Sequence, residues 1–225
     1  VFTSGATEAN NLALKGVAEA AWERGDPRRG LVTLASEHRA VLDPLQWLSR
    51  HGFRLTVLPV EADGLVDPQR LAAAIGPDTR LVSVMAANNE TGVLHPIAEA
   101  AAICRAHGAL LHVDAVQAAG RMPIRLTELG CDSIAISSHK IGGPMGVGAL
   151  LLAPKHSHIP ALIRGGGQER GRRGGTHAVP AIAGFAAAVS EIVAEDRLGA
   201  LRDMVESAAI AAGAEPVSVD APRLS

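Results

Sequence analysis

The chain has 225 residues, of which 48% are hydrophobic and 20% are charged. This composition predicts a globular protein with one main core and excludes an intrinsically disordered chain. A formal net charge of −2 supplies no basic excess for nucleic-acid binding. With two cysteines, no recognisable leader and no apolar run approaching the length of a membrane span, we expect a cytoplasmic protein without membrane or nucleic-acid partners.

Apolar runs of strand length alternate with helix-length segments of mixed polarity. The expected strands are 31–36, 54–60, 80–87, 109–115 and 132–138, and the expected helices lie near 8–21, 40–51, 67–75 and 97–107. Strands that are continuously apolar predict an α/β fold, with a mostly parallel sheet covered by helices on both faces. The run 147–153 follows a glycine-rich turn and is a candidate for antiparallel pairing.

Both ends of the sequence suggest a fragment. The opening VFTSG predicts a first strand that is cut short upstream. Pro180 is expected to open a long Ala-rich helix that reaches about residue 212. We therefore expect a large domain over residues 1–190, followed over 191–225 by a linker helix and the start of a truncated small C-terminal domain.

Ligands of open α/β sheets collect beyond the carboxyl ends of the strands, so polar residues there are candidates for chemistry. The segment SGATEANN (4–11) combines a glycine turn with a helix start, which can hold a phosphate. The alternative is a plain helix cap by Ser4 or Thr7. His38, after strand 31–36, is either functional or a helix-start residue bonded to backbone.

The next strand ends pose similar choices. After 80–87, the residues Asn88, Asn89 and Gly92 could be simple turn formers. Asp114 ends a buried apolar run, where a carboxylate is costly unless a cation or strong donors meet it. Lys140 follows strand 132–138 and is expected over the same crevice. A direct Asp114–Lys140 ion pair is the structural alternative.

Pyridoxal phosphate is a cofactor that requires all of these groups at once. It needs an amine for a Schiff base, a carboxylate that keeps the pyridine nitrogen protonated, and a phosphate cup at a helix N-terminus. In this hypothesis the partner of Asp114 is the ligand and not Lys140. Because aromatic residues make up only 2% of the chain and Tyr is absent, a histidine is a candidate to stack on the ring.

Six strings in chain order carry a resemblance to a known family. They are FTSGATEANN, SEHRAV, NNETGV, HVDAVQAAG, SSHKIGGPMGVGAL and GGGQERGRRGGT, and they span essentially residues 1–185. They resemble the class V group of fold-type I pyridoxal-phosphate enzymes, most closely the bacterial cysteine desulfurases of the NifS/IscS type. The resemblance implies a fold-type I large domain, and a transferase that converts L-cysteine to L-alanine and keeps the sulfur as an enzyme persulfide. It also implies a homodimer, a sulfur acceptor or iron–sulfur scaffold as partner, and a role in iron–sulfur cluster assembly or other sulfur metabolism.

The resemblance also assigns roles to individual residues. Catalysis would use Lys140, which forms the Schiff base and moves the substrate α-proton, and His38, which stacks on the cofactor ring. The implied contacts are Ala6, Thr7, Ser137 and His139 with the phosphate, Asp114 with the pyridine nitrogen, Asn89 and Gln117 with the ring hydroxyl side, and Thr176 with the phosphate of the other subunit. No metal is expected.

The sequence departs from the family at several positions. The family usually has Gly or Ala at Ser138, commonly Lys at Met145, and Ser or Ala at Gly174. Cys104 and Cys131 do not match the family's persulfide-forming cysteine and are interpreted as small buried residues. That cysteine, and the arginine that grips the substrate carboxylate, are expected beyond residue 225.

An arginine cluster and a pair of histidines have structural interpretations. The cluster Arg164, Arg170, Arg172 and Arg173 is interpreted as interface and phosphate-side charge, since no aromatics interleave it. His156 and His158 are interpreted as surface residues, since no carboxylate or cysteine nearby completes a metal set. The alternatives to a cysteine desulfurase are another class V enzyme, such as a selenocysteine lyase or an aminotransferase, and a non-catalytic fragment.

Overall fold

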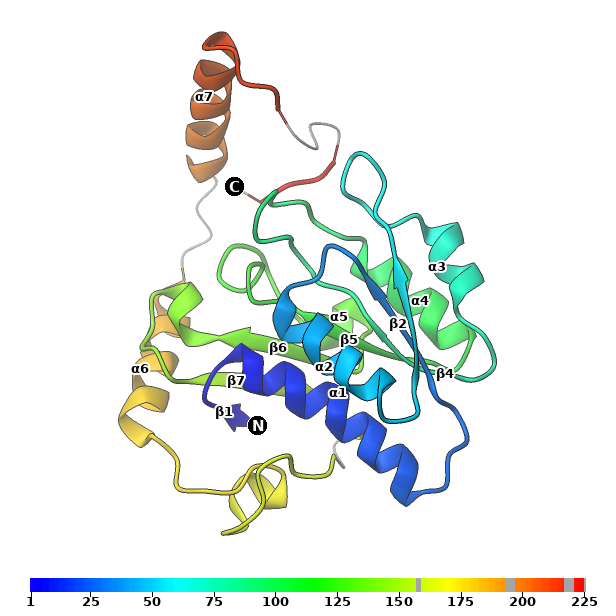
Figure 1. The fold of residues 1–225 in the computed structure, drawn as a ribbon. Coiled ribbons are helices and arrows are strands. Elements are labelled where there is room, and N and C mark those ends of the chain that lie inside the picture. Colours follow the sequence, from blue (N-terminus) through cyan, green and yellow to red (C-terminus); the bar gives the residue numbers. More distant parts are fainter. Residues whose placement is uncertain (157–158, 193–196, 217–220, 225) are drawn as a thin grey trace.

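A computed structural model describes residues 1–156, 159–192, 197–216 and 221–224. In this part of the chain, seven strands form one sheet in the order β1-β7-β6-β5-β4-β2-β3 (Figure 1). The strands are β1 (Phe2–Thr3), β2 (Gly30–Leu34), β3 (Arg54–Leu58), β4 (Thr79–Ser83), β5 (Leu110–Asp114), β6 (Ser133–Ser137) and β7 (Gly148–Leu152). The order places β4, β5 and β6, after which the polar candidates follow, side by side.

The strand directions confirm the expected α/β architecture. Strands β2 to β6 pair parallel, whereas β7 pairs antiparallel with both β6 and β1. The expected strand 80–87 is longer than β4, but its backbone continues beside β5: Val84 donates to the His112 carbonyl at 3.1 Å and Ala86 to the Asp114 carbonyl at 2.8 Å. The loop that follows therefore begins next to the end of β5.

Helices cover both faces of the sheet. On one face lie α1 (Ala6–Glu23) and α2 (Arg39–Ser49), and on the other lie α3 (Pro68–Ala74), α4 (Ile97–Ala106) and α5 (Leu126–Leu129). Leu14 of α1 and Leu45 of α2 belong to one buried cluster, and Leu71 of α3 and Ile97 of α4 belong to another. None of the helices in the described ranges is long and apolar enough to cross a membrane.

The long helix expected from Pro180 to about residue 212 is wrong. α6 (Val179–Ser190) ends in a turn at Glu191, and α7 (Arg197–Ala211) is a separate helix. α6 packs against the short 3-10 helix η1 (Ser138–Ile141), whereas α7 stands away from the sheet (Figure 1). Helix propensity is high on both sides of the break, so propensity alone does not locate the end of α6.

A close approach of two glycines fixes the start of α1 over the sheet. A Cβ on Gly148 of β7 would lie 2.7 Å from the Cα of Gly5, and Gly5 itself has a φ of 152°. A side chain at position 148 would therefore push away the turn that leads into α1. The two glycines keep the N-terminus of α1 close to the ends of β6 and β7.

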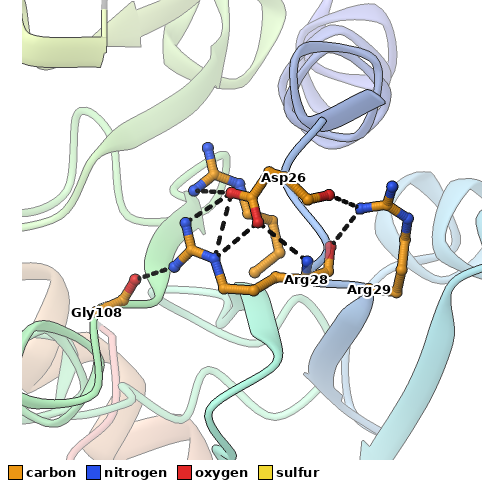
Figure 2. A network of polar contacts seen from close by, with 5 residues as sticks. Asp26, Arg28, Arg29 and Gly108 are labelled. Carbon is orange, nitrogen blue, oxygen red and sulfur yellow. Dashed lines mark hydrogen bonds and ion pairs between the residues drawn. The ribbon is translucent and has the colours of Figure 1, made fainter. Parts of the chain in front are cut away.

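A charged network lies at the amino ends of the strands, at the opposite end from the polar candidates (Figure 2). Asp26, in the connection between α1 and β2, accepts hydrogen bonds from Arg28, with Nη2 at 2.8 Å, and lies 3.5 Å from Arg80 at the start of β4. Arg28 also donates to the Gly108 carbonyl, just before β5, at 2.8 Å. The hydrogen bonds from Arg28 hold the pKa of Asp26 well below its usual value. The network ties the amino ends of the strands together, away from the polar candidates.

Candidate functional site

A cavity of about 700 Å³ lies beyond the carboxyl ends of β4, β5 and β6. Such a volume suits a small-molecule ligand. Of the site residues expected from the sequence, all but Thr176 line it: Ala6, Thr7, His38, Asn89, Asp114, Gln117, Ser137, His139 and Lys140. The fold therefore brings segments that are far apart in sequence to one site.

Asp114 is a buried carboxylate that faces this cavity. It is 6% exposed at the end of β5; Oδ1 accepts from the Val116 amide at 3.0 Å and Oδ2 from Asn10 Nδ2 at 2.7 Å. Burial raises the pKa of Asp114, although the hydrogen bonds from Val116 and Asn10 oppose that rise. A cationic group in the cavity would relieve the cost of the buried charge.

Lys140 lines the same cavity from η1, directly after β6. Within the described chain, neither a hydrogen bond nor an ion pair engages its amine, whereas Asp114 is bonded to Asn10 and Val116. The alternative of a direct Asp114–Lys140 ion pair is therefore wrong. The arrangement leaves a carboxylate and an amine available to a ligand between them.

The N-terminus of α1 opens onto the cavity without a side-chain cap. Gly5 is the N-cap, and neither Ser4 nor Thr7 caps the helix with its hydroxyl. The plain-cap alternative is therefore wrong, and the first amides of α1 have no partner within the helix. Ser137 and His139 line the cavity nearby, and a hydrogen bond of 2.9 Å joins Ser137 Oγ and His139 Nδ1. Unpaired amides at a helix start suit an anion such as a phosphate.

His38 is a helix-start residue that also lines the cavity. It is the N-cap of α2, where Nδ1 accepts from the Ala40 amide at 3.0 Å, and it lines the cavity. Because Nδ1 is the acceptor, the proton of the neutral ring lies on Nε2. The helix cap fixes the ring at the rim of the site.

The residues after β4 divide between turn and cavity. Asn88 forms the turn: its Oδ1 accepts from the amides of Glu90 and Thr91, both at 2.9 Å, and its Nδ2 donates to the Ser36 carbonyl at 3.1 Å. Asn89 lines the cavity. Asn88 thus holds the loop bearing Asn89 against the segment that precedes His38.

Gln117 and Thr176 differ in their relation to the cavity. Gln117 lines it, and its Oε1 accepts from Arg121 Nη1 at 3.1 Å. Thr176 is exposed in the loop before α6 and is not among the residues that line the cavity. Its assignment to the phosphate of another subunit stays a prediction.

Sequence reasoning missed three buried polar residues beside Asp114. Asn10 and His112 are fully buried, and Glu37 is 5% exposed. Burial, and repulsion from Asp114, raise the pKa of Glu37 well above its usual value. The signal was present in the sequence, because Asn10 lies on the apolar face of a helix and His112 interrupts an apolar strand.

The two cysteines are small buried residues, as interpreted from the sequence, whereas the interface role of the arginine cluster stays a prediction. Cys104 and Cys131 are buried, and burial raises their pKa values to about 12 and about 11, so both remain thiols. Arg164 pairs with Glu19. The side chains of His156 and His158 lie outside the described residues. Among those described, no group of His, Cys, Asp and Glu residues could hold a metal ion.

The fold and cavity together define an α/β domain that presents a carboxylate, an amine and a helix N-terminus to a single cavity. The aminotransferase class-V family matches residues 1–208, and the chain belongs to this family. A cysteine desulfurase IscS from Anaeromyxobacter sp. (strain Fw109-5) is 52% identical over 186 residues, which are 82% of this chain and 45% of that protein. The chain spans about half the length of the curated relatives it matches.

Solved structures show the same relationship. A NifS-like protein superposes with a TM-score of 0.89 at 40% identity, over 96% of this chain and 60% of that one. A structure titled "SspA in complex with cysteine" superposes with a TM-score of 0.83 at 36% identity, over 92% of this chain and 60% of that one. The expected fold class and family are thereby confirmed.

Proposed function

We propose that this chain carries the pyridoxal-phosphate site of a cysteine desulfurase that acts on L-cysteine. The observation that carries the proposal is that Asp114 and Lys140 line one cavity without pairing with each other. Similarity to proteins named cysteine desulfurase and to a structure containing cysteine supports the substrate. The class V family supports the cofactor.

The residues present fit this cofactor. The amides at Ala6 and Thr7, with Ser137 and His139, would hold the phosphate. Asp114 would hold the ring nitrogen, His38 one ring face, and Asn89 and Gln117 the ring hydroxyl side. Bound pyridoxal phosphate supplies an aldehyde that bonds to amines and a ring that accepts the electrons released at the substrate Cα.

The protein groups then have distinct tasks. The Asp114 carboxylate, desolvated and held by two donors, favours a proton on a nitrogen that faces it. The Lys140 amine, which has no partner in the described structure, is available to remove the proton from the substrate Cα and to return it. The Nδ1 bond to Ala40 holds His38 in place while these proton transfers occur.

Sulfur transfer needs a thiolate that reaches the substrate. Cys104 and Cys131 do not line the cavity, and burial keeps both protonated. We therefore propose that a cysteine other than these two receives the sulfur. From there the sulfur would pass to an acceptor or iron–sulfur scaffold protein.

The proposal includes a homodimer. Thr176 is exposed and outside the cavity of its own chain, which supports a role at the phosphate of a second subunit. Thr176, at the end of the glycine-rich loop formed by residues 164–176, would then complete the neighbouring site. Size measurement of the loaded protein by light scattering tests this part, and a monomer that binds the cofactor as tightly as a dimer would contradict it.

The central experiment is reconstitution with pyridoxal phosphate. The parent protein should retain a visible absorption band after gel filtration, and borohydride should bleach it by reducing a bond to a lysine. Lys140→Ala should lack the band, whereas the control Lys155→Ala should keep it, since Lys155 pairs with Asp132 at 3.2 Å outside the cavity. A parent protein that stays colourless after incubation would contradict the proposed function and favour a non-catalytic fragment.

Isotope exchange tests the substrate. In deuterated buffer, the loaded protein should exchange the α-proton of L-cysteine, and this exchange does not require the sulfur-accepting cysteine. A marked preference for selenocysteine would favour a selenocysteine lyase. Exchange confined to other amino acids would favour an aminotransferase.

A further inference from the structure

A chain of buried hydrogen bonds runs from Asp114 through three further side chains. Asn10 Nδ2 donates to Asp114 Oδ2 at 2.7 Å, Asn10 Oδ1 lies 2.9 Å from His112 Nε2, and His112 Nδ1 lies 2.8 Å from Ser133 Oγ. Asn10 and His112 are fully buried and Ser133 is 7% exposed. The hydrogen bonds join α1, β5 and β6, and Asn10 itself lines the cavity.

The geometry fixes the direction of every proton in this chain. A carboxylate can only accept, so the amide nitrogen of Asn10 must face Asp114. The amide oxygen then faces His112 Nε2, which must carry the ring proton. Burial lowers the pKa of His112 to about 3, so the ring is neutral and its Nδ1 accepts from the Ser133 hydroxyl.

A second buried carboxyl group competes with Asp114 for the negative charge. Glu37 is buried directly before His38, and burial and the Asp114 charge outweigh the one donor that favours its ionised form, the backbone of Met85. Asp114, by contrast, has two donors. When two carboxyl groups lie close in an apolar setting, the one with more donors keeps the charge and the other remains protonated.

We propose that Asn10, His112 and Ser133 are positioning residues that make Asp114, and not Glu37, the ionised carboxylate facing the cofactor. This inference rests on the proposed function for its purpose, since a ring nitrogen stays protonated only beside an ionised partner. His112 acts through Asn10, because its Nε2 proton holds Asn10 in the one orientation that donates to Asp114. Hydrogen bonds in a chain of this kind also polarise and strengthen one another.

The test measures the ionisation of Asp114 in the protein without cofactor. The protein is labelled with carboxyl ¹³C-aspartate and titrated by NMR. The Asp114 signal is identified by its loss in Asp114→Asn. Asn10→Leu should raise the pKa of Asp114 by about one to two units, the loss expected for a hydrogen bond to a charged group. His112→Leu should raise it by about half a unit or more.

Conservative and control variants separate this effect from general damage. His112→Gln keeps a donor near the Nε2 position and should restore the parent pKa. His95→Leu removes another buried imidazole, whose nitrogens have no partner in the described structure, and should leave Asp114 unchanged. The other titratable groups lining the cavity, Glu8, His38, Glu90, His139 and Lys140, are the same in all of these variants.

The loaded protein provides a second readout. With ¹⁵N in the cofactor ring, the pH at which the ring nitrogen loses its proton should fall in His112→Leu and recover in His112→Gln. If His112→Leu does not fold, Ser133→Ala takes its place and should shift both titrations in the same directions.

Equal Asp114 pKa values in the parent and in the folded variant would overturn the inference. A parent protein that takes up no cofactor would instead overturn the proposed function, and the titration without cofactor would still decide the role of His112.

Discussion

Arg173 donates from Nε to Glu8 Oε1 over 2.8 Å and from Nη2 to Glu8 Oε2 over 3.2 Å. Glu8 lies in the first turn of α1 and lines the cavity, so this fork joins the glycine-rich loop to the proposed phosphate end. Burial favours the neutral form of Glu8, but hydrogen bonds from Arg173 and Ser4 outweigh it and lower the pKa of Glu8. Glu8 is therefore ionised, and the positive charge of Arg173 offsets its negative charge beside the proposed phosphate site.

Arg173→Ala should weaken cofactor binding. The variant leaves the Glu8 carboxylate without its cation beside the phosphate, and we expect about a tenfold loss of affinity for pyridoxal phosphate. Glu8→Gln combined with Arg173→Ala removes the repulsion and should recover most of the loss. Fluorescence titration measures the affinity for pyridoxal phosphate of the parent, the single variant and the double variant. A double variant that binds as weakly as Arg173→Ala would show that the guanidinium acts by another route.

Asp114→Ala should separate cofactor binding from chemistry. The phosphate contacts remain, so cofactor affinity should fall much less than the rate of α-proton exchange. That rate should fall by about 10²-fold or more, the scale on which fixed charges stabilise charge that develops in a reaction. Exchange measured by NMR in deuterated buffer at saturating cofactor tests this, and equal rates in variant and parent would remove Asp114 from its assigned role.

Ser138→Ala should stabilise the protein. Ser138 is fully buried after β6, and within the described chain its hydroxyl has no hydrogen-bond partner. Removing an unsatisfied buried hydroxyl should raise the free energy of unfolding by about 1 kcal/mol. Ser133→Ala is the matched control and should destabilise, because its hydroxyl bonds His112 at 2.8 Å. Urea denaturation gives both values, and the same sign for both variants would contradict the argument.

His95 should contribute to unfolding by acid. Burial lowers its pKa from 6.5 to about 4, so between these values the unfolded chain binds a proton that the folded chain does not. Stability should therefore fall as pH drops from 6.5 to 4, and this group accounts for about 3 kcal/mol of the loss. His95→Leu should flatten that part of the curve, as measured by urea midpoints across the range. An unchanged slope would show that His95 is not the cause.

The sequence indicated the site more completely than it indicated how each residue is held. Strand ends predicted that Asp114 and Lys140 would share a crevice, and they do. Spacing alone did not show whether these two pair with each other. The structure answers because the Asp114 carboxylate accepts from Asn10 and Val116, whereas no ion pair joins it to Lys140 in the described part of the chain.

By itself, the sequence determined the layered α/β architecture, the family and the set of residues at the strand ends, because hydrophobic period and local motifs are written along the chain. Only the tertiary structure decided where the long C-terminal helix breaks, that His38 both caps a helix and faces the cavity, and that Asn10 and His112 stand behind Asp114. The hydrogen bonds of Asn10 join segments about a hundred residues apart, and the cavity beside His38 forms only where separate strand ends come together. Local periodicity in the sequence specifies neither of these arrangements, so only the folded structure shows them.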